Sequence, residues 1–277
     1  MGRPSFETRP AAAPQDEAER VANHGSQPMT RAGWIRLLVI AAAVAVLEIA
    51  CRVGWIPVTV VIPPSAMATS LYDIIASGTH WNDILVSLRS VVAAAVIAVL
   101  LGFLVGAVIH AFPVVRGAVE PLLASYYAVP TFMFYPVFII LFGVGSGAII
   151  AIAVLLAIVA MISATLTGLD RIPTVLGKTA RIMRLGPVER AFRISLPAAM
   201  PYLFTGVKLA VAYAFIGVIA SEFILSGAGM GYAIAYAYNN FNNREMYGLM
   251  LLIVLVVTVV NTALDTVDRR LQARLRR

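Results

Sequence analysis

The sequence has few charged residues and almost no cysteine. Asp, Glu, Lys and Arg make up 13% of its 277 residues, whereas soluble domains carry about 25%. The one cysteine, Cys51, excludes an intrachain disulfide. The three histidines (His24, His80 and His110) do not have the spacing of metal ligands. We therefore interpret them as surface or helix-end residues and expect neither a metal nor a cofactor.

Apolar residues dominate instead. They make up 60% of the chain, and its mean hydropathy is +0.88. Six apolar runs are each close to the roughly 20 residues that cross a bilayer as a helix. A water-soluble helical protein would need a charged face along these runs, which they lack. We predict an all-α integral membrane protein with transmembrane helices at about 34–51, 88–111, 118–142, 147–167, 203–225 and 246–264.

The two ends of the chain differ from this transmembrane domain, which we place at 34–268. Residues 1–33 are polar, rich in Pro and Ala, and lack the apolar stretch of a signal peptide. This composition is typical of a disordered tail. Residues 269–277 form a second, basic tail.

The basic residues predict the orientation. Six spans place both termini on one side, and if that side is the cytoplasm, most of the 21 basic residues lie there. They fall in the N-terminal tail, in 171–193 and in 269–277, with Arg116 between the second and third spans. Lys208 lies near the inner end of the fifth span, and Arg52, Arg89 and Arg244 fall outside. Basic residues concentrate in cytoplasmic segments, so both termini are predicted to be cytoplasmic. The net charge of +7 then reports orientation, not nucleic-acid binding.

Residues 174–201, which we call the basic loop, interrupt the apolar pattern. The segment contains five basic residues and one acidic residue, Glu189, so it is predicted to lie in the cytoplasm. It is long and helix-patterned, which indicates a docking surface more than a simple connection. Gly177-Lys178-Thr179 is similar to the end of a phosphate-binding loop, but Ile172 replaces the required glycine and no strand precedes it. If ATP drives this protein, another chain must bind it.

Two features of the spans are candidates for function. In the third span, aromatic residues cluster around Pro130 and Pro136, and broken helices in membranes are tolerated where they are buried or line a cavity. This segment is either a substrate-lining wall or a kinked packing helix. Glu222 lies late in the fifth span without a nearby base. It either lines a pathway or bonds to a neighbouring helix. The substrate-path candidates are Tyr127, Phe132, Tyr135 and Glu222.

Other patterns predict packing. Glu48 and Arg52 form an i,i+4 pair near the outer end of the first span. Gly102 and Gly106 allow close helix packing, most simply within the chain. The external connection 53–85 contains a helical pattern that begins near Pro64. The glycine- and asparagine-rich stretch 226–243 is too polar and broken for a span, and is predicted to dip back or lie along the outer surface.

The basic loop resembles the signature loop of bacterial ATP-binding-cassette importer permeases. That loop runs Glu-Ala-Ala, three residues, Gly, nine residues, Ile, one residue, Leu-Pro. The frame falls here on Lys178-Thr179-Ala180, Arg184, Ile194, Leu196 and Pro197. Pro63-Pro64-Ser65, the Phe-Gly-Val-Gly at 142–145 and the Ser-Glu-Phe at 221–223 are also similar to the branch that transports nitrate, sulfonates, taurine and bicarbonate. The sequence departs from the pattern at Lys178, where the family has an acid, and at Arg184, where it has glycine; Gly186-Pro187 is expected to supply the helix break.

The resemblance implies the type I importer permease fold and a set of partners. These are a cytoplasmic ATP-binding subunit, an extracytoplasmic solute-binding protein and a second permease copy in the bacterial inner membrane, with no nucleic acid. The chain itself would not be an enzyme. The residues implied to couple to the ATPase are Lys178, Ala180, Arg184, Leu185, Gly186, Val188, Phe192, Ile194, Leu196 and Pro197. The alternatives are a secondary transporter or channel that works without ATP, and a membrane anchor in a non-transport assembly.

Overall fold

The computed structural model describes residues 31–275, and all regular structure in that range is helical. The predictions for residues 1–30 lie outside the described part of the chain. The described residues divide into two units, one up to Val58 and one from Thr59 onward. The first unit contains α2 (Arg31–Val53). There Arg52 Nε donates to Glu48 Oε1 at 2.6 Å, which confirms the predicted pair.

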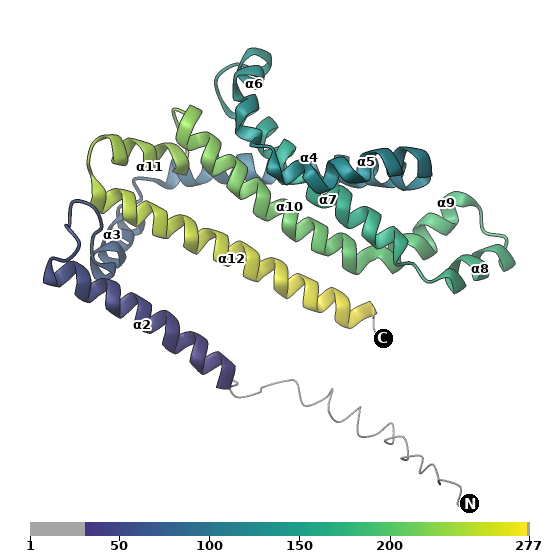
Figure 1. Ribbon diagram of the computed structural model, residues 1–277, viewed down its shortest axis with the longest axis horizontal. Coiled ribbons are helices and arrows are strands. Elements are labelled where there is room, and N and C mark those ends of the chain that lie inside the picture. Colours follow the sequence, from purple (N-terminus) through teal and green to yellow (C-terminus); the bar gives the residue numbers. More distant parts are fainter. Residues whose placement is uncertain (1–30, 276–277) are drawn as a thin grey trace, which may run out of the picture. The chain divides into compact units, whose positions relative to one another are not determined.

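Three long helices form the centre of the second unit. They are α4 (Trp81–Ala111), α7 (Ser146–Asp170) and α10 (Leu196–Leu225), and α7 packs along both of the others (Figure 1). Small residues make these contacts: a Cβ on Gly102 would lie 2.7 Å from Met161 Cβ, and one on Gly217 would lie 2.7 Å from Ala153 Cα. Close backbone approach is how helices associate in lipid. The predicted intrachain role of the Gly102–Gly106 pair is confirmed, since Gly106 meets Thr165.

The third apolar run is not one straight helix. It consists of α5 (Pro113–Ser125), two short 3₁₀ turns, η1 (Tyr126–Ala128) and η2 (Thr131–Phe134), and α6 (Tyr135–Phe142), with a bend of 94° between its halves. Pro130 lies at the bend, where it has no N–H to continue a helical ladder. The described residues therefore contain five helices that are long and apolar enough to cross a membrane, or six if the bent pair is counted as one.

Three further helices complete the second unit. α3 (Pro64–Ser77) confirms the helix predicted near Pro64 and packs against α12 (Asn243–Leu275). α12 continues beyond residue 264, so that Arg269 and Arg270 are helical. α11 (Met230–Asn239) occupies the stretch expected to be broken. Between its glycine and its final asparagine, α11 has an apolar stripe that is buried against α12: Ala233, Ile234 and Ala237.

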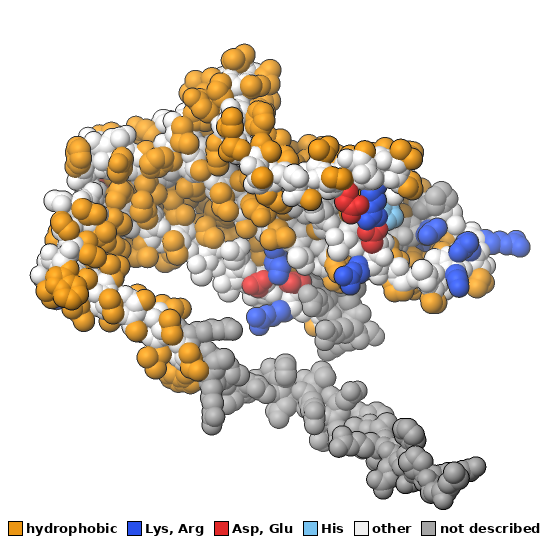
Figure 2. All heavy atoms as spheres, in the orientation of Figure 1, with side chains coloured by type: hydrophobic (Ala, Val, Ile, Leu, Met, Phe, Trp, Pro, Cys, Tyr) orange, Lys and Arg blue, Asp and Glu red, His pale blue; other side chains and the backbone are white. Residues whose placement is uncertain are grey.

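The basic loop consists of three short helical pieces. α8 (Thr174–Ile182) is followed by α9 (Pro187–Arg190) and by a π-helical turn, η3 (Ala191–Ser195), which leads directly into α10. In Figure 2, the visible surface of the spans is mostly hydrophobic, and Lys and Arg side chains gather at the end of the molecule where α8 and α9 lie. This distribution agrees with a loop in water next to spans in lipid.

Candidate functional sites: the basic loop and a buried carboxylate

The turn after α8 has a backbone that favours glycine at the position of Arg184. Leu185 N–H donates to Ala180 O and Arg184 N–H donates to Arg181 O, each at 3.1 Å. These two bonds define a Schellman motif, in which the residue after the helix adopts a left-handed backbone. Arg184 has φ +50° and occupies that position. The break covers residues 183–186: it contains Gly186, as expected, and Pro187 begins the next helix, but its left-handed residue is Arg184.

One face of the basic loop exposes apolar side chains. Val188 is 69% exposed and Phe192 is 67% exposed, on adjacent turns of α9 and η3. On α8 and the turn after it, Ile182 is 82% and Met183 61% exposed. A polar segment in water gains nothing by exposing four large apolar side chains, so this face is suited to burial against a partner.

The other coupling candidates are distributed around the same pieces. Ala180 is 1% exposed and is the buried residue of α8. Leu185, Ile194 and Leu196 are half-buried, whereas Lys178, Gly186 and Pro197 are exposed. Glu189 and Arg193 pair with each other at 2.9 Å on the surface.

An ion pair joins the root of the loop to α5. Arg116 donates from both terminal nitrogens to the two carboxylate oxygens of Asp170, each at 2.7 Å. His110, in the last turn of α4, lies 3.3 Å from Asp170 Oδ1. Asp170 is the last residue of α7, directly before the loop. Because two parallel hydrogen bonds join the side chains, they fix the relative orientation of Arg116 and Asp170 more strongly than a single charge contact would. Sequence analysis missed it, because the two residues are far apart in the chain.

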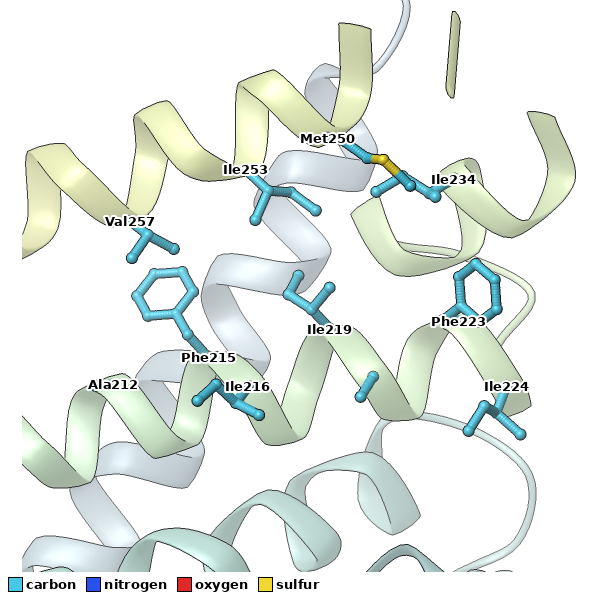
Figure 3. Close-up of a pocket in the computed structure, with 11 residues that line it drawn as sticks. Ala212, Phe215, Ile216, Ile219, Phe223, Ile224, Ile234, Met250, Ile253 and Val257 are labelled. Carbon is cyan, nitrogen blue, oxygen red and sulfur yellow. The ribbon is translucent and has the colours of Figure 1, made fainter. Parts of the chain in front are cut away.

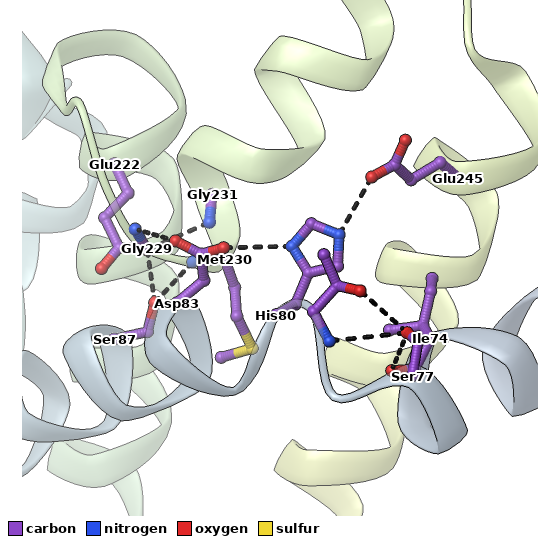
Figure 4. Close-up of polar contacts among 11 residues, drawn as sticks. Ile74, Ser77, His80, Asp83, Ser87, Glu222, Gly229, Met230, Gly231 and Glu245 are labelled. Carbon is purple, nitrogen blue, oxygen red and sulfur yellow. Dashed lines mark hydrogen bonds and ion pairs between the residues drawn. The ribbon is translucent and has the colours of Figure 1, made fainter.

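Glu222 is buried at the other end of α10. Only 1% of its surface is exposed. Its Oε2 accepts hydrogen bonds from Ser87 Oγ at 2.6 Å and from Gly231 N–H at 3.0 Å (Figure 4). Its Oε1 has no partner among the described residues. Of its two predicted roles, the bond to neighbouring helices is therefore present; path lining stays a prediction.

The bonds to Glu222 are part of a polar site that holds the start of α11. We call this site, formed by Asp83, Ser87 and Glu222, the seat of α11. Gly229 N–H donates to Asp83 Oδ1 at 3.1 Å and Met230 N–H donates to Ser87 Oγ at 2.8 Å. The first N–H groups of a helix lack partners within it, and negative charge near them is favourable. Here, side chains from α4 and α10 supply the missing acceptors. Ser87 and Asp83 lie four residues apart on one face of α4, but nothing in the sequence links that face to residues 229–231.

The same polar set continues toward α12. His80 directly precedes α4, as expected of a helix-end residue. Its Nδ1 lies 3.0 Å from Asp83 Oδ2 and its Nε2 2.9 Å from Glu245 Oε1 (Figure 4). Asn242 donates to the other oxygen of Glu245 at 2.6 Å. These contacts tie α4, α11 and α12 together. Among the described residues, no group of three or more His, Cys, Asp or Glu side chains is arranged so that it could hold a metal ion.

The aromatic candidates lie apart from Glu222. The ring of Tyr127 stacks on Tyr213 of α10, with centroids 5.3 Å apart. Phe132 is half-buried, and Tyr135 is 40% exposed at the start of α6. Tyr213 and Glu222 are separated by roughly 13 Å along the axis of α10, at 1.5 Å per residue. Tyr127, which stacks on Tyr213, therefore lies well away from Glu222 along α10, and a single path lined by all four candidates stays a prediction.

An apolar cavity of about 590 Å³ lies between α10, α11 and α12 (Figure 3). All of its lining side chains are apolar, including Phe215, Ile219 and Met250. It offers no side-chain hydrogen-bond donor to a polar solute, whereas specific small-molecule sites contain a few placed polar groups. We do not assign it to the substrate.

Residues 98–277 match the family model of binding-protein-dependent transport system inner membrane components. The chain belongs to this family. It is 28% identical over 193 residues to the nitrate import permease protein NrtB of Leptolyngbya laminosa, which covers 70% of this chain and 69% of that protein. It is 24% identical over 193 residues to the taurine transport system permease protein TauC of Escherichia coli, over 70% of each chain.

Solved structures show the same fold. A chain of the MetNI methionine ABC transporter, in an inward-facing conformation, superposes with a TM-score of 0.59 and 18% sequence identity. The match covers 69% of this chain and 96% of that chain. The prediction of an all-α importer permease fold is therefore confirmed. The chain is a multi-pass component of the inner membrane and a permease subunit of a transport system.

Proposed function

We propose that this chain forms part of the path for a small anion in an ATP-driven importer, and that its basic loop docks on a separate cytoplasmic ATPase. The observation that carries the docking is the exposed apolar face with Val188 and Phe192 at its centre. The family supplies the transport role. The chain itself carries out no covalent chemistry in this proposal.

The two apolar residues are suited to anchor the partner. Val188 and Phe192 lie one turn apart, which places them on one helical face. Truncating a central anchor of an interface typically costs over about 1 kcal/mol, whereas exposed ion pairs contribute about 0 to 1 kcal/mol. The Glu189–Arg193 pair lies beside these residues and is exposed, so it is expected to add little.

The test replaces each anchor with a charge. Val188→Asp and Phe192→Asp should release the ATPase, or uncouple its hydrolysis from transport, while the spans remain inserted. Arg193→Ala is the matched control and should retain most of the binding. The measurement is pull-down of the ATPase from detergent-solubilised membranes, paired with uptake. If both aspartate variants bind the ATPase and transport as the unchanged protein does, the loop is not the docking site.

We propose an anion as substrate because the relatives named above are a nitrate permease and a taurine permease. An extracytoplasmic binding protein would deliver it, and a second copy of this chain would complete the path around Tyr127, Phe132, Tyr135 and Glu222. Uptake of labelled nitrate and labelled taurine should be measured in cells that express the chain with its ATPase and binding protein. Transport of neither nitrate nor taurine, whose sulfonate is its anionic group, together with transport of a solute that has no oxyanion group, would contradict this assignment.

The proposed orientation places both termini and the basic loop in the cytoplasm. In a Cys51→Ser background, single cysteines at Thr174 and Ala273 should resist an impermeant thiol reagent in intact cells. A cysteine at Asn240, at the end of α11, should react. Lysed cells provide the control, since all three sites should then be labelled. Reaction of the first two sites in intact cells would reverse the orientation.

A further inference from the structure

The basic loop has a second surface, to which Val188 and Phe192 do not contribute. It is a groove of about 450 Å³ between the end of α7, α8 and η3. Arg181 of α8 and Arg190 of α9 line it, together with the hydroxyl residues Thr174 and Ser195. His110, at the end of α4 and 3.3 Å from Asp170, also lines it, and the remaining walls are Leu169, Ile172, Pro173, Gly177, Ala191 and Ile194. No Asp or Glu lines this groove.

Within the described part of the chain, the two arginines have no carboxylate partner. The ion pairs of residues 31–275 do not include Arg181 or Arg190, and Glu189, the acid of the basic loop, pairs with Arg193 instead. The guanidinium of Arg190 crosses Gly177, where an added Cβ would lie 3.6 Å from one of its terminal nitrogens. Arg181 follows Gly177 by one helical turn on the same face of α8. Both positive charges therefore meet in one groove.

The groove lies where the apolar spans end. α7 is apolar up to Asp170, and the apolar helix that contains α10 begins at Val188. The groove takes its residues from both sides of this boundary. An apolar wall beside unpaired guanidinium groups, at the level where hydrocarbon gives way to water, has the chemistry of a phospholipid headgroup site. Arginine is also the side chain whose planar fork matches phosphate oxygens.

We propose that this groove binds the phosphate of an anionic phospholipid from the inner leaflet. Arg181 and Arg190 hold the phosphate, Thr174 and Ser195 donate to headgroup oxygens, and the start of the acyl chains covers Ile172 and Ile194. The site differs from the ATPase-docking face, because Val188 and Phe192 do not line the groove. The inference does not depend on the ATPase assignment.

The experiment measures lipid retention by the purified full-length chain. The chain is incubated in detergent with equal amounts of phosphatidylglycerol and phosphatidylcholine, and retained lipid is counted by native mass spectrometry. The unchanged chain should retain phosphatidylglycerol preferentially. Arg181→Gln with Arg190→Gln should lower that retention about tenfold or more, since each cation near an anionic lipid contributes about one tenfold step or slightly less.

Matched variants separate the groove from general charge. Arg184→Gln with Arg193→Gln removes the same charge from the same loop outside the groove and should retain the lipid. Arg181→Lys with Arg190→Lys should give an intermediate loss, because lysine keeps the charge without the planar fork. Equal retention by the glutamine groove variant and the unchanged chain would overturn the proposal. Equal loss in the control pair would also overturn it, since net charge would then suffice.

Two further measurements test whether the groove binds a lipid phosphate or a soluble anion, and whether its arginines contact lipid or the ATPase. Inorganic phosphate added alone should not displace phosphatidylglycerol; displacement would mean that the groove takes a soluble anion. If the glutamine groove variant retains the lipid but releases the ATPase, the arginines belong to the ATPase interface and the lipid site is refuted. Val188→Asp, by contrast, should retain the lipid whatever happens to the ATPase, which keeps the two proposals distinguishable.

Discussion

Gly231→Ala should dislodge the start of α11 from its seat. An added Cβ would meet the carbonyl oxygen of Ile219 and would lie 2.7 Å from Glu222 Cβ and 2.8 Å from Phe223 N. Two of these atoms belong to the backbone of α10, so they cannot rotate away as the end of a flexible side chain would. α11 must therefore shift to admit one methyl group.

The cost has two parts. Overpacking a filled site costs about 1 to 3 kcal/mol. A shift of α11 also stretches the bond from Gly231 N–H to Glu222, and an intramolecular hydrogen bond contributes about 0.5 to 1.5 kcal/mol. A total of about 3 kcal/mol is a large part of the 5 to 15 kcal/mol that stabilises a typical fold. For a chain of this size it corresponds to a fall in Tm of about 6 to 12 °C.

The assay is thermal unfolding of the purified chain in one detergent, combined with hydrogen exchange. Exchange should rise at the amides of α11 and stay unchanged in α8. Gly227→Ala is the matched control, because no atom lies within 4 Å of its added Cβ. It should melt with the unchanged protein. If Gly231→Ala also melts with the unchanged protein and α11 stays protected, the close contact between α11 and α10 is not what holds this helix.

Two other predictions concern the residues in and beside the basic loop. Arg184→Gly should raise the free energy of unfolding of α8 by about 1 kcal/mol, because a left-handed backbone strains any residue with a Cβ. Slower hydrogen exchange in α8 would support this prediction, and faster exchange would contradict it. Arg116→Asp alone should weaken coupling between ATP hydrolysis and uptake at a stability cost of about 1 kcal/mol, discounted because the pair is partly exposed. Adding Asp170→Arg should restore coupling by reversing the pair, and no rescue in the double variant would argue against it.

The sequence predicted elements that depend on local patterns. Apolar run length predicts α4, α7 and α10, and i,i+4 spacing predicts the Glu48–Arg52 pair. The bend at Pro130 was only half foreseen: the proline indicates a break, but the 94° angle depends on what packs around it. α11 was missed as a helix because its glycines normally disfavour one. Gly231, the glycine within α11, is required here by its contact with the backbone of α10 at Ile219 and Phe223, which is a tertiary cause.

The candidate site divides in the same way. The basic loop was predictable because its charge and helical pattern are contiguous in the sequence. The seat of α11 was not, since Ser87, Glu222 and Gly231 come from three separate segments. Glu222 was conspicuous as a carboxylate in an apolar run, but its partners are a hydroxyl and a backbone N–H, which carry no charge signal. For the same reason, Arg116 and Asp170 gave no sign of pairing until the fold brought them together.

The two ends of the molecule are connected by one helix. Residues 188–225 form a continuous helical run of 38 residues, about 57 Å long at 1.5 Å per residue. Its weak point is near the loop, where η3 is a π-helical turn and Pro197 and Pro201 lack N–H groups to bond the preceding turn. Beyond that point, Gly206 and Gly217 hold α10 against Ala164 and Ala153 of α7. We therefore expect a force on Phe192 to bend the entry of the helix first and then to move α7 and α10 together. Because Glu222 lies on the far part of α10, we expect such a movement to carry the seat of α11 with it, and the Arg116–Asp170 pair to pass the displacement from α7 to α5.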